Sequence, residues 1–531
     1  MIAEKRPACL RTWPHGFSFT TKAASVAALI ILADTLFFRE RVGTTLGVFC
    51  LTWLSLILCC QRLLIRHRGA RVAAGVATVA GLALIYDPSL LAAVLFWCAL
   101  SLGVLFSRSG IFDNAWRWIK RLAFHAVLTV PAPLLDFVRV LRARRHRGTV
   151  RLLPQLPVLA LPVLGTCVFV ALFAVANPLI GNALHAIDLW RLIDAISIVR
   201  IAFWTAVAIC VWNSFRPRPI RMADFNGTEI DIRLPGASVA SVRLSLVAFN
   251  TVFLVQNSLD AAILWGGAEL PPGVTLAEYA HRGAYPLIAT ALLAGLFVLL
   301  TLKPGSATAQ SPLLRQLVYF WIAQNVFLVA SSILRTLDYI EAYSLTRLRI
   351  AALLWMVLVA IGLVLLCWRI WRSKSGAWLI NANALAATAV LMSCSFIDLG
   401  AIAANWNVRH AREAGGRGAA LDLCYLRQLG PSALVPLVEL EVARLDPILQ
   451  DRLSAVRTAT FQSLVRGQQD WHGWIWRNAQ RLKTANALLA KNRLSDADTD
   501  RRRCDGRRIA PPPPDNPPVP PLKTLTAAPV R

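Results

Sequence analysis

The chain has 531 residues, of which 56% are hydrophobic and only 16% are charged, and its mean hydropathy is +0.54. A soluble globular protein is about one quarter charged, so these values exclude an ordinary soluble enzyme or binding domain. The net charge of +27 does not indicate nucleic-acid binding, because most basic residues stand in short loops beside apolar segments. We therefore expect a lipid bilayer, and no nucleic acid, as a partner.

The hydropathy pattern predicts about eleven membrane-spanning helices, within a range of about ten to twelve, because each apolar segment is near the length that crosses hydrocarbon. The predicted fold class is therefore all-α, a polytopic α-helical membrane protein. The predicted spans are 22–38, 45–64, 70–86, 88–107, 152–176, 196–213, 244–266, 284–302, 314–335, 350–371 and 378–398.

Connections rich in arginine alternate with connections that contain little Lys or Arg. The connection after the second predicted span holds Arg62, Arg66, Arg68 and Arg71, and residues 139–151 are richer still. Since positively charged loops stay in the cytoplasm, this alternation predicts a cytoplasmic amino terminus. An odd number of spans then places the residues after Asp398 on the extracytoplasmic side.

The pattern divides the chain into five parts. Residues 1–107 form a four-span segment, 108–151 a basic amphipathic cytoplasmic connection, and 152–398 a seven-span core. Residues 399–494 are expected to form a small helical module outside the membrane, and 495–531 a disordered tail rich in Pro and Arg. In the basic connection, tryptophans alternate with cations, which predicts either an interfacial helix on anionic headgroups or a helix packed beneath the bundle. These residues are Trp116, Arg117, Trp118, Ile119, Lys120 and Arg121.

In the carboxyl-terminal module, Leu445, Leu449, Leu453 and Val456 recur at helical spacing, and Asp446 precedes Pro447 as an expected N-cap. Three tryptophans follow, which either close a small core or touch the membrane surface; they are Trp471, Trp474 and Trp476. Two cysteines of this part can form a disulfide only if the module is extracytoplasmic; they are Cys424 and Cys504.

Polar side chains on two predicted spans share helix faces, so they are candidates for a polar cavity or for a proton or solute path. The alternative, which the positions near span ends favour, is interhelical hydrogen bonding with salt bridges at the headgroup level. The candidates are Asn250, Asn257, Asp260, Gln324, Arg335, Asp338 and Glu341. Asp34, late in the first span, is expected to be isolated and interfacial.

Catalytic motifs are absent from the sequence, since it contains neither a phosphate-binding Gly-x-x-x-x-Gly-Lys loop nor a Gly-x-Ser-x-Gly elbow. Glu278 and His281 have metal-ligand spacing, but no second pair matches them, and no Cys-x-x-Cys occurs. We therefore predict no catalytic residue, no metal site and no cofactor, and lean toward a protein that is not an enzyme.

Several segments together resemble a bacterial membrane family known as "domain of unknown function 4173", over roughly residues 150–480. The segments are Trp265-Gly-Gly-Ala-Glu-Leu-Pro271, Tyr279-Ala-His-Arg-Gly-Ala-Tyr-Pro286, Gln324-Asn325, Tyr339-Ile-Glu-Ala-Tyr-Ser-Leu-Thr-Arg-Leu-Arg349, Trp378-Leu-Ile-Asn-Ala-Asn383, Ser395-Phe-Ile-Asp398 and Asp422-Leu-Cys-Tyr-Leu426. The resemblance implies a bacterial cytoplasmic-membrane location and supplies no activity or catalytic residue.

Three functions remain open at this point. The first is a non-enzymatic envelope scaffold or sensor-like component whose outer module meets an envelope protein. The second is a transporter or channel that uses the polar faces. The third is a membrane enzyme acting on a lipid-linked substrate, with acidic and histidine residues on the outer side, namely Asp188, Asp194, Glu269, Glu278 and His281.

Overall fold

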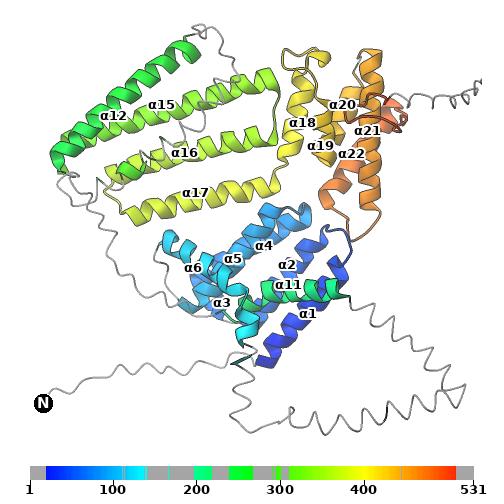
Figure 1. The fold of residues 1–531 in the computed structure, drawn as a ribbon, viewed down its shortest axis with the longest axis horizontal. Helices are drawn as coiled ribbons and strands as arrows, with labels where there is room; N and C mark the ends of the chain where they lie inside the picture. Colours follow the sequence, from blue (N-terminus) through cyan, green and yellow to red (C-terminus); the bar gives the residue numbers. More distant parts are fainter. Residues whose placement is uncertain are drawn as a thin grey trace, which may run out of the picture.

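The computed structural model describes residues 19–61, 63–109, 114–136, 197–217, 238–266, 310–443 and 445–509, with a few single positions between these ranges. Throughout these ranges the regular elements are helices, and the only β-type pairing described is one bridge between Arg502 and Arg508. The helices form two membrane-spanning groups and a module that packs at one end of both (Figure 1). The predicted all-α, multi-pass fold is therefore confirmed.

The first group contains the amino-terminal helices and one helix from the middle of the chain. Its members are α1 (Phe19–Phe37), α2 (Thr45–Cys60), α3 (Leu63–Arg66), α4 (Arg68–Tyr86), α5 (Leu90–Ser109), α6 (Ala115–Thr129) and α11 (Ile198–Phe215). The second group contains α12 (Val239–Asp260) with a π-helical turn (Ala261–Trp265), then α15 (Pro312–Tyr343), α16 (Arg347–Trp371) and α17 (Gly376–Phe396).

Serine and threonine caps start most of the later spans. The side chains of Ser197, Ser238, Ser311, Thr346 and Ser375 each accept a hydrogen bond from a backbone N–H in the first turn of the following helix. Such a cap satisfies a donor that the helix itself leaves unpaired. The short polar connections thus determine where each apolar helix begins.

Nine described helices coincide with predicted spans, and eight of them have the length and apolarity to cross a membrane. The ninth, α2, is equally apolar but has only 16 residues. Most of the predicted spans 152–176 and 284–302 lies outside the described residues, so the total of about eleven stays a prediction.

Small residues let the helices of the first group approach closely. Five alanines of α4 are buried, and Gly47 of α2 lies so near α4 that a Cβ there would stand 2.4 Å from the backbone nitrogen of Ile85. Close backbone approach of this kind is how helices pack in lipid, where burial of apolar surface gives little preference for contact. Leu29, Ile57 and Phe96 fill the space around this contact.

Helix α17 joins the two groups, because it packs against α16 on one side and against α4, α5 and α6 on the other. Asn381 of α17 accepts a hydrogen bond from the backbone nitrogen of Ala115 at the start of α6, at 2.8 Å. The predicted helix in the basic connection exists as α6, with Asn114 as its N-cap. Trp118 is buried whereas Trp116 is half exposed, so α6 packs against the bundle with one face and leaves the other open.

The module begins directly after α17. It consists of α18 (Leu399–His410), a 3₁₀ turn η2 (Arg412–Ala414), α19 (Leu423–Leu429), a 3₁₀ turn η3 (Gly430–Ala433), α20 (Leu434–Glu441), α21 (Pro447–Gln468) and α22 (Trp476–Asn492). Asp446 caps α21 by accepting from the backbone nitrogens of Ile448 and Leu449, as predicted, and Pro447 is the first helical residue. Leu453 and Val456 are buried in the module core.

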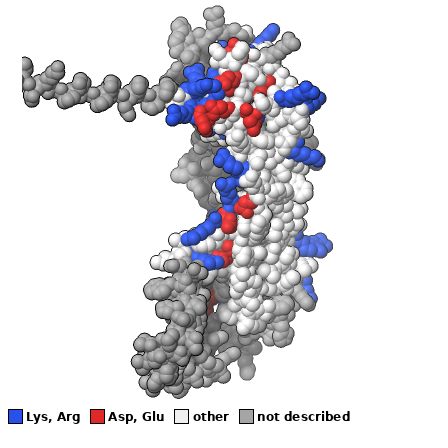
Figure 2. All heavy atoms as spheres, turned by 90° about the vertical axis from the view of Figure 1, so that its right-hand side faces the viewer, with Lys and Arg blue, Asp and Glu red and all other residues white. Residues whose placement is uncertain are grey.

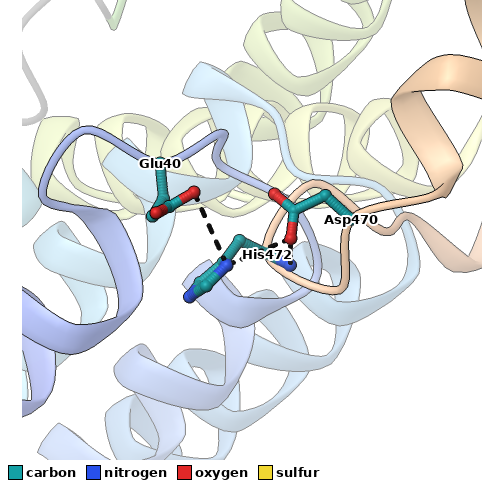
Figure 3. Close-up of side chains that lie close together, drawn as sticks. All are labelled: Glu40, Asp470 and His472. Carbon is teal, nitrogen blue, oxygen red and sulfur yellow. Dashed lines mark hydrogen bonds and ion pairs between the residues drawn. The ribbon is translucent and has the colours of Figure 1, made fainter.

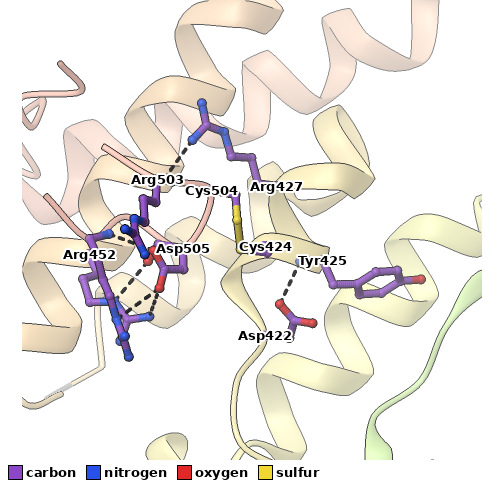
Figure 4. Close-up of a disulfide and its surroundings, with 9 residues drawn as sticks. Asp422, Cys424, Tyr425, Arg427, Arg452, Arg503, Cys504 and Asp505 are labelled. Carbon is purple, nitrogen blue, oxygen red and sulfur yellow. Dashed lines mark hydrogen bonds and ion pairs between the residues drawn. A yellow bond between two sulfur atoms is a disulfide. The ribbon is translucent and has the colours of Figure 1, made fainter. Parts of the chain in front are cut away.

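The module extends beyond the predicted boundary at residue 494. Residues 495–509 are not a disordered tail: Cys504 forms a disulfide with Cys424 of α19, with the two Cα atoms 4.8 Å apart (Figure 4). Arg457 of α21 is fully buried and pairs with Glu441 at 2.8 Å and with Asp496 at 2.8 Å. The charged composition suggested a solvated tail, but these charges are compensated within the fold. Residues 510–531 lie outside the described part.

The tryptophans Trp471, Trp474 and Trp476, just before and at the start of α22, do not form a core. Trp471 and Trp476 are exposed and Trp474 is partly buried. They lie at the end of the module that contacts the membrane helices, since Trp474 accepts a hydrogen bond from the backbone nitrogen of Thr44 between α1 and α2. This position favours contact with the membrane surface, where amphipathic tryptophan rings are enriched.

Candidate functional site

Two amides connect α12 and α15 inside the second group. Asn250 of α12 accepts a hydrogen bond from the side chain of Gln324 of α15 at 2.7 Å, and it donates to the carbonyl of Leu317 at 3.2 Å. About two turns further along α12, Asn257 donates to the backbone carbonyl of Gln324 at 3.1 Å. All three amides are buried. They therefore form a polar seam between two spans, which is the interhelical arrangement that the sequence favoured.

The seam ends in a buried ion pair. Asp260, the last residue of α12, accepts a hydrogen bond from the guanidinium of Arg335 on α15, and both side chains are buried. Gln256 donates to the same carboxylate at 2.9 Å. Arg335 stands eight residues before the end of α15 at Tyr343, which corresponds to a depth of ~12 Å along the helix. The pair thus lies inside the span rather than at its end.

The other two candidates lie apart from this pair. Asp338 is partly buried one turn beyond Arg335, whereas Glu341 is exposed. Glu341 lines a cavity of about 300 Å³ beside α18, together with Trp406, His410 and Arg417. The structure therefore brings five of the seven candidates together along α12 and α15 and leaves Asp338 and Glu341 toward the module.

A second ion pair lies within the spans of the first group. Asp34 of α1 accepts hydrogen bonds from Nε of Arg200 at 2.9 Å and from the indole nitrogen of Trp204 at 2.9 Å, both on α11. The expectation that Asp34 is isolated was wrong, because its partners are 166 and 170 residues away in sequence. Its position near the end of α1 was foreseen. The sequence did offer one signal for this pairing: Arg200 and Trp204 are four residues apart and therefore lie on one face of the predicted helix.

A buried histidine sits where α6 meets α11. Asn213 donates from its amide nitrogen to Nδ1 of His125 at 3.2 Å and to the hydroxyl of Thr129 at 3.1 Å. Burial lowers the pKa of His125 to about 4, so the imidazole is neutral at pH 7. A neutral ring is also what an amide donor requires of its acceptor nitrogen. These hydrogen bonds hold α6, which belongs to the basic connection, against α11 of the first group.

Ion pairs fasten the module to the ends of three spans. Arg477 of α22 pairs with Asp87, between α4 and α5, and also donates to the carbonyl of Phe396 at the end of α17. Arg481, one turn later, pairs with Asp398. Asp398 also caps α18 by accepting from Gly400 and Ala401, each at 3.0 Å. Asp398, the residue at the predicted end of the last span, is therefore the N-cap of α18 and part of the junction.

The electrostatics of these two aspartates differ. Burial is the main influence on both and favours the neutral acid. At Asp87 burial prevails over the nearby Arg477, and the pKa is raised. At Asp398 the charge of Arg481 and hydrogen bonds from Ala401 and Ser432 outweigh burial, and the pKa is lowered. Asp398 is thus the more firmly ionised anchor.

A third arginine at the junction is Arg347, the first residue of α16. The guanidinium of Arg347 donates to the carbonyl of Leu429 at 3.4 Å and to the hydroxyl of Ser432 at 3.3 Å. It lies against Gly400, where a Cβ would stand 2.4 Å from a guanidinium nitrogen. A cavity of about 340 Å³ lies among these groups. Spans from both groups thus meet one small region of the module.

The module also forms a basic pocket of about 560 Å³ with the loop between α1 and α2. The described lining includes Arg41, Arg427 and Arg466, the hydroxyls of Thr460 and Ser463, and no carboxylate. Elsewhere on the face of the molecule that carries the module, basic and acidic side chains lie next to one another (Figure 2). A cavity with this lining suits a ligand that carries negative charge.

Some predicted positions are not described. Asp188, Asp194, Glu269, Glu278 and His281, considered for metal binding or for lipid-linked chemistry, lie outside the described residues. From the sequence, Arg477 and Arg481 were not candidates for any role, and Arg347 stood only within one segment of the family resemblance. The sequence contains little signal for such a role, because an arginine on an exposed helix has the same local pattern whether or not it pairs with a distant residue.

Comparison with known proteins identifies a family without a known activity. Residues 73–440 match the family described as "Domain of unknown function (DUF4153)". No curated protein and no solved structure matches the chain. The resemblance to a multi-pass family of unknown function is thus confirmed at that level, although the matching family is numbered 4153 and not 4173. Since the match covers well over half of the sequence, the chain belongs to the DUF4153 family of unknown function.

Proposed function

We propose that the protein is a non-enzymatic component of the bacterial cell envelope, a scaffold or sensor in the cytoplasmic membrane. The observation that carries this proposal is the junction. Arg477 and Arg481 link the module to the ends of α4 and α17, and Arg347 links it to α16. A module held on both helical groups at once transmits a binding event on its surface to the spans, or positions a partner above them.

Two features support an extracytoplasmic module and a cytoplasmic amino terminus. Disulfides persist in oxidising compartments, and the Cys424–Cys504 bridge lies in the module. The span ends away from the module carry runs of positive charge, namely Arg66, Arg68 and Arg71, then Arg369, Arg372 and Lys374. Such runs are typical of the cytoplasmic side. We also propose that the exposed face of α6, with Arg117 and Lys120, binds anionic headgroups there.

Fusions after Ile509, the last described residue of the module, test this orientation. Alkaline phosphatase should be active there, and a cytoplasm-dependent fluorescent protein should stay dark. The opposite result would place the module inside and exclude an extracytoplasmic role.

The basic pocket is the surface on which we expect a partner or ligand with negative charge. A photoreactive residue in place of Gln462, which lines the pocket, should give one discrete envelope-protein adduct in living cells. The adduct should disappear with Arg466→Glu at the pocket and persist with Arg493→Glu, an exposed control at the end of α22. Equal adducts in both charge variants would show that the pocket does not determine binding.

The buried Asp260–Arg335 pair favours a second candidate, a transporter with a polar path along α12 and α15. Ionisable residues inside spans are often part of ion or solute paths. Against this candidate, the amides of the seam bond across the two helices, as structural contacts do. Flux and thermal stability measured together on the Asp260→Asn variant distinguish the two: lost flux at unchanged stability supports the path, and lost stability supports a structural pair.

A further inference from the structure

Three groups with metal-binding atoms meet where the module touches the loop between α1 and α2. Glu40 belongs to that loop, and Asp470 and His472 belong to the turn between α21 and α22 (Figure 3). One ligand atom from each residue lies within 4.8 Å of the others. The Nδ1 atom of His472 is 3.1 Å from a carboxylate oxygen of Asp470 and 3.6 Å from one of Glu40.

The backbone holds these two segments together independently of the three side chains. Thr44 donates from its backbone nitrogen to the carbonyl of Trp474 at 2.8 Å, and the hydroxyl of Thr45 donates to the carbonyl of His472 at 3.4 Å. At Gly43, a Cβ would lie 2.4 Å from the same Trp474 oxygen, so only glycine permits this approach. The three side chains are therefore positioned by backbone contacts that do not depend on a bound ion.

The orientation of the imidazole is determined from outside the cluster. Its Nε2 atom lies 3.2 Å from the carbonyl oxygen of Thr35 in α1, and since a carbonyl only accepts, Nε2 carries the proton. In a neutral ring, Nδ1 then presents a lone pair to two carboxylates. Histidines that bind metals characteristically donate their second N–H to a backbone carbonyl in this way.

A cation among these three groups would offset the repulsion between the two carboxylates and the Nδ1 lone pair. A proton on Nδ1 satisfies Asp470, but the 3.6 Å separation from Glu40 is too long for a hydrogen bond. Ligand atoms that share an ion at ~2.1 Å lie roughly 3.0–3.4 Å apart, close to the separations of Nδ1 from both carboxylates. A shared ion would contact both carboxylates directly, whereas a proton on Nδ1 forms a hydrogen bond with Asp470 alone.

We propose that Glu40, Asp470 and His472 bind a divalent transition-metal ion, with Zn²⁺ as the best fit, and that this ion bridges the membrane helices and the module. One imidazole and two carboxylates match zinc, whereas calcium and magnesium prefer shells made of oxygen alone. Three protein ligands leave a position for water. Because Glu40 is exposed and the other two are partly buried, the ion exchanges with the solvent outside the module.

The test uses the full-length protein in detergent after removal of metals with a chelator. Equilibrium dialysis against Zn²⁺, followed by elemental analysis, should give one ion per chain. Binding should also raise the thermal unfolding temperature, because an ion that binds only the folded state stabilises it. Glu40→Gln and His472→Ala should each weaken zinc binding at least about tenfold.

Two control variants test whether the loss of zinc binding is specific to the three residues of the cluster. Glu439→Gln and His410→Ala change exposed groups of the module outside the cluster and should bind zinc like the parent protein. Circular dichroism and gel filtration confirm that each variant is folded. Absence of stoichiometric zinc binding by the folded parent protein overturns the proposal. Binding that needs His472 but survives Glu40→Gln overturns the bridge, because the ion would then belong to the module alone.

Discussion

Asp260 and Arg335, 75 residues apart in sequence, form an ion pair at the buried contact of α12 and α15. Neither side chain has appreciable solvent exposure, and a π-helical turn follows Asp260 directly. Removing one member of a buried pair leaves the other charge without compensation in a medium of low polarity. The pair is therefore a sensitive point of the second helical group.

Asp260→Asn should destabilise the protein by about 3–5 kcal/mol, because Arg335 then keeps a buried charge without its counter-charge. The double variant Asp260→Asn with Arg335→Gln should lose less than the sum of the two single changes. Chemical unfolding in detergent measures these values. Strictly additive losses would show that the two residues act independently. Loss of a transport activity at unchanged stability would favour the transporter candidate.

Acidification should destabilise the contact of α6 with α11 through His125. Above pH 6.5, the ring is neutral in the folded and unfolded states, so it adds no pH dependence there. Between 6.5 and about 4, the unfolded chain takes up a proton and the folded protein does not, so stability falls by up to about 3 kcal/mol. In His125→Gln this part of the pH dependence should vanish, whereas the exposed control His410→Gln should retain it. Thermal unfolding from pH 7 to 4 compares the three proteins.

Reduction of the disulfide should loosen the module. The bridge closes a loop of 80 residues, and the loop-entropy relation gives a loss of about 4 kcal/mol when it opens. Unfolding with and without a phosphine reductant measures the effect. The double variant Cys424→Ser with Cys504→Ser should resemble the reduced protein and show no response to reductant. Recovery of both cysteines as free thiols from cells under trapping conditions would contradict the bridge.

The pairing of Asp398 with Arg481 should show a favourable coupling of about 1–3 kcal/mol in a double-mutant cycle, because both groups are largely shielded at the junction. The suitable control is the pair of Arg507 with Asp505, in which the arginine is exposed and a coupling below about 1 kcal/mol is expected. Equal coupling in both pairs would indicate that the junction contributes no more than a surface contact.

Local patterns predicted much of this fold. Runs of apolar residues predicted most of the described spans to within about five residues, because the thickness of the bilayer imposes the length of a spanning helix. Helix α15 is the exception, since it extends to Tyr343, eight residues beyond its predicted end at Arg335. Asp446 before Pro447 gave the start of α21 because a cap depends only on neighbours in sequence. The polar face of α12 likewise predicted that Asn250 and Asn257 lie together, since the period of a helix determines it.

Local sequence patterns did not predict the pairings between residues that are far apart in the sequence. Asp34 with Arg200, Asp87 with Arg477, and Arg457 with Asp496 depend on how helices pack, and a single sequence does not encode that visibly. The same limit explains why residues 495–509 appeared to be a tail. Their composition is highly charged, and only the packed structure shows that Cys504 and Asp496 have partners on α19 and α21.

The contact of Thr44 with Trp474 has a consequence for biosynthesis. The first two spans are made early, whereas the turn that receives them is translated some 430 residues later. The amino-terminal hairpin therefore remains in the membrane without its final neighbour until the turn at His472–Trp474 has been translated. Until then the backbone nitrogen of Thr44 lacks the carbonyl that accepts its hydrogen bond in the folded protein, so the contact between hairpin and module forms late.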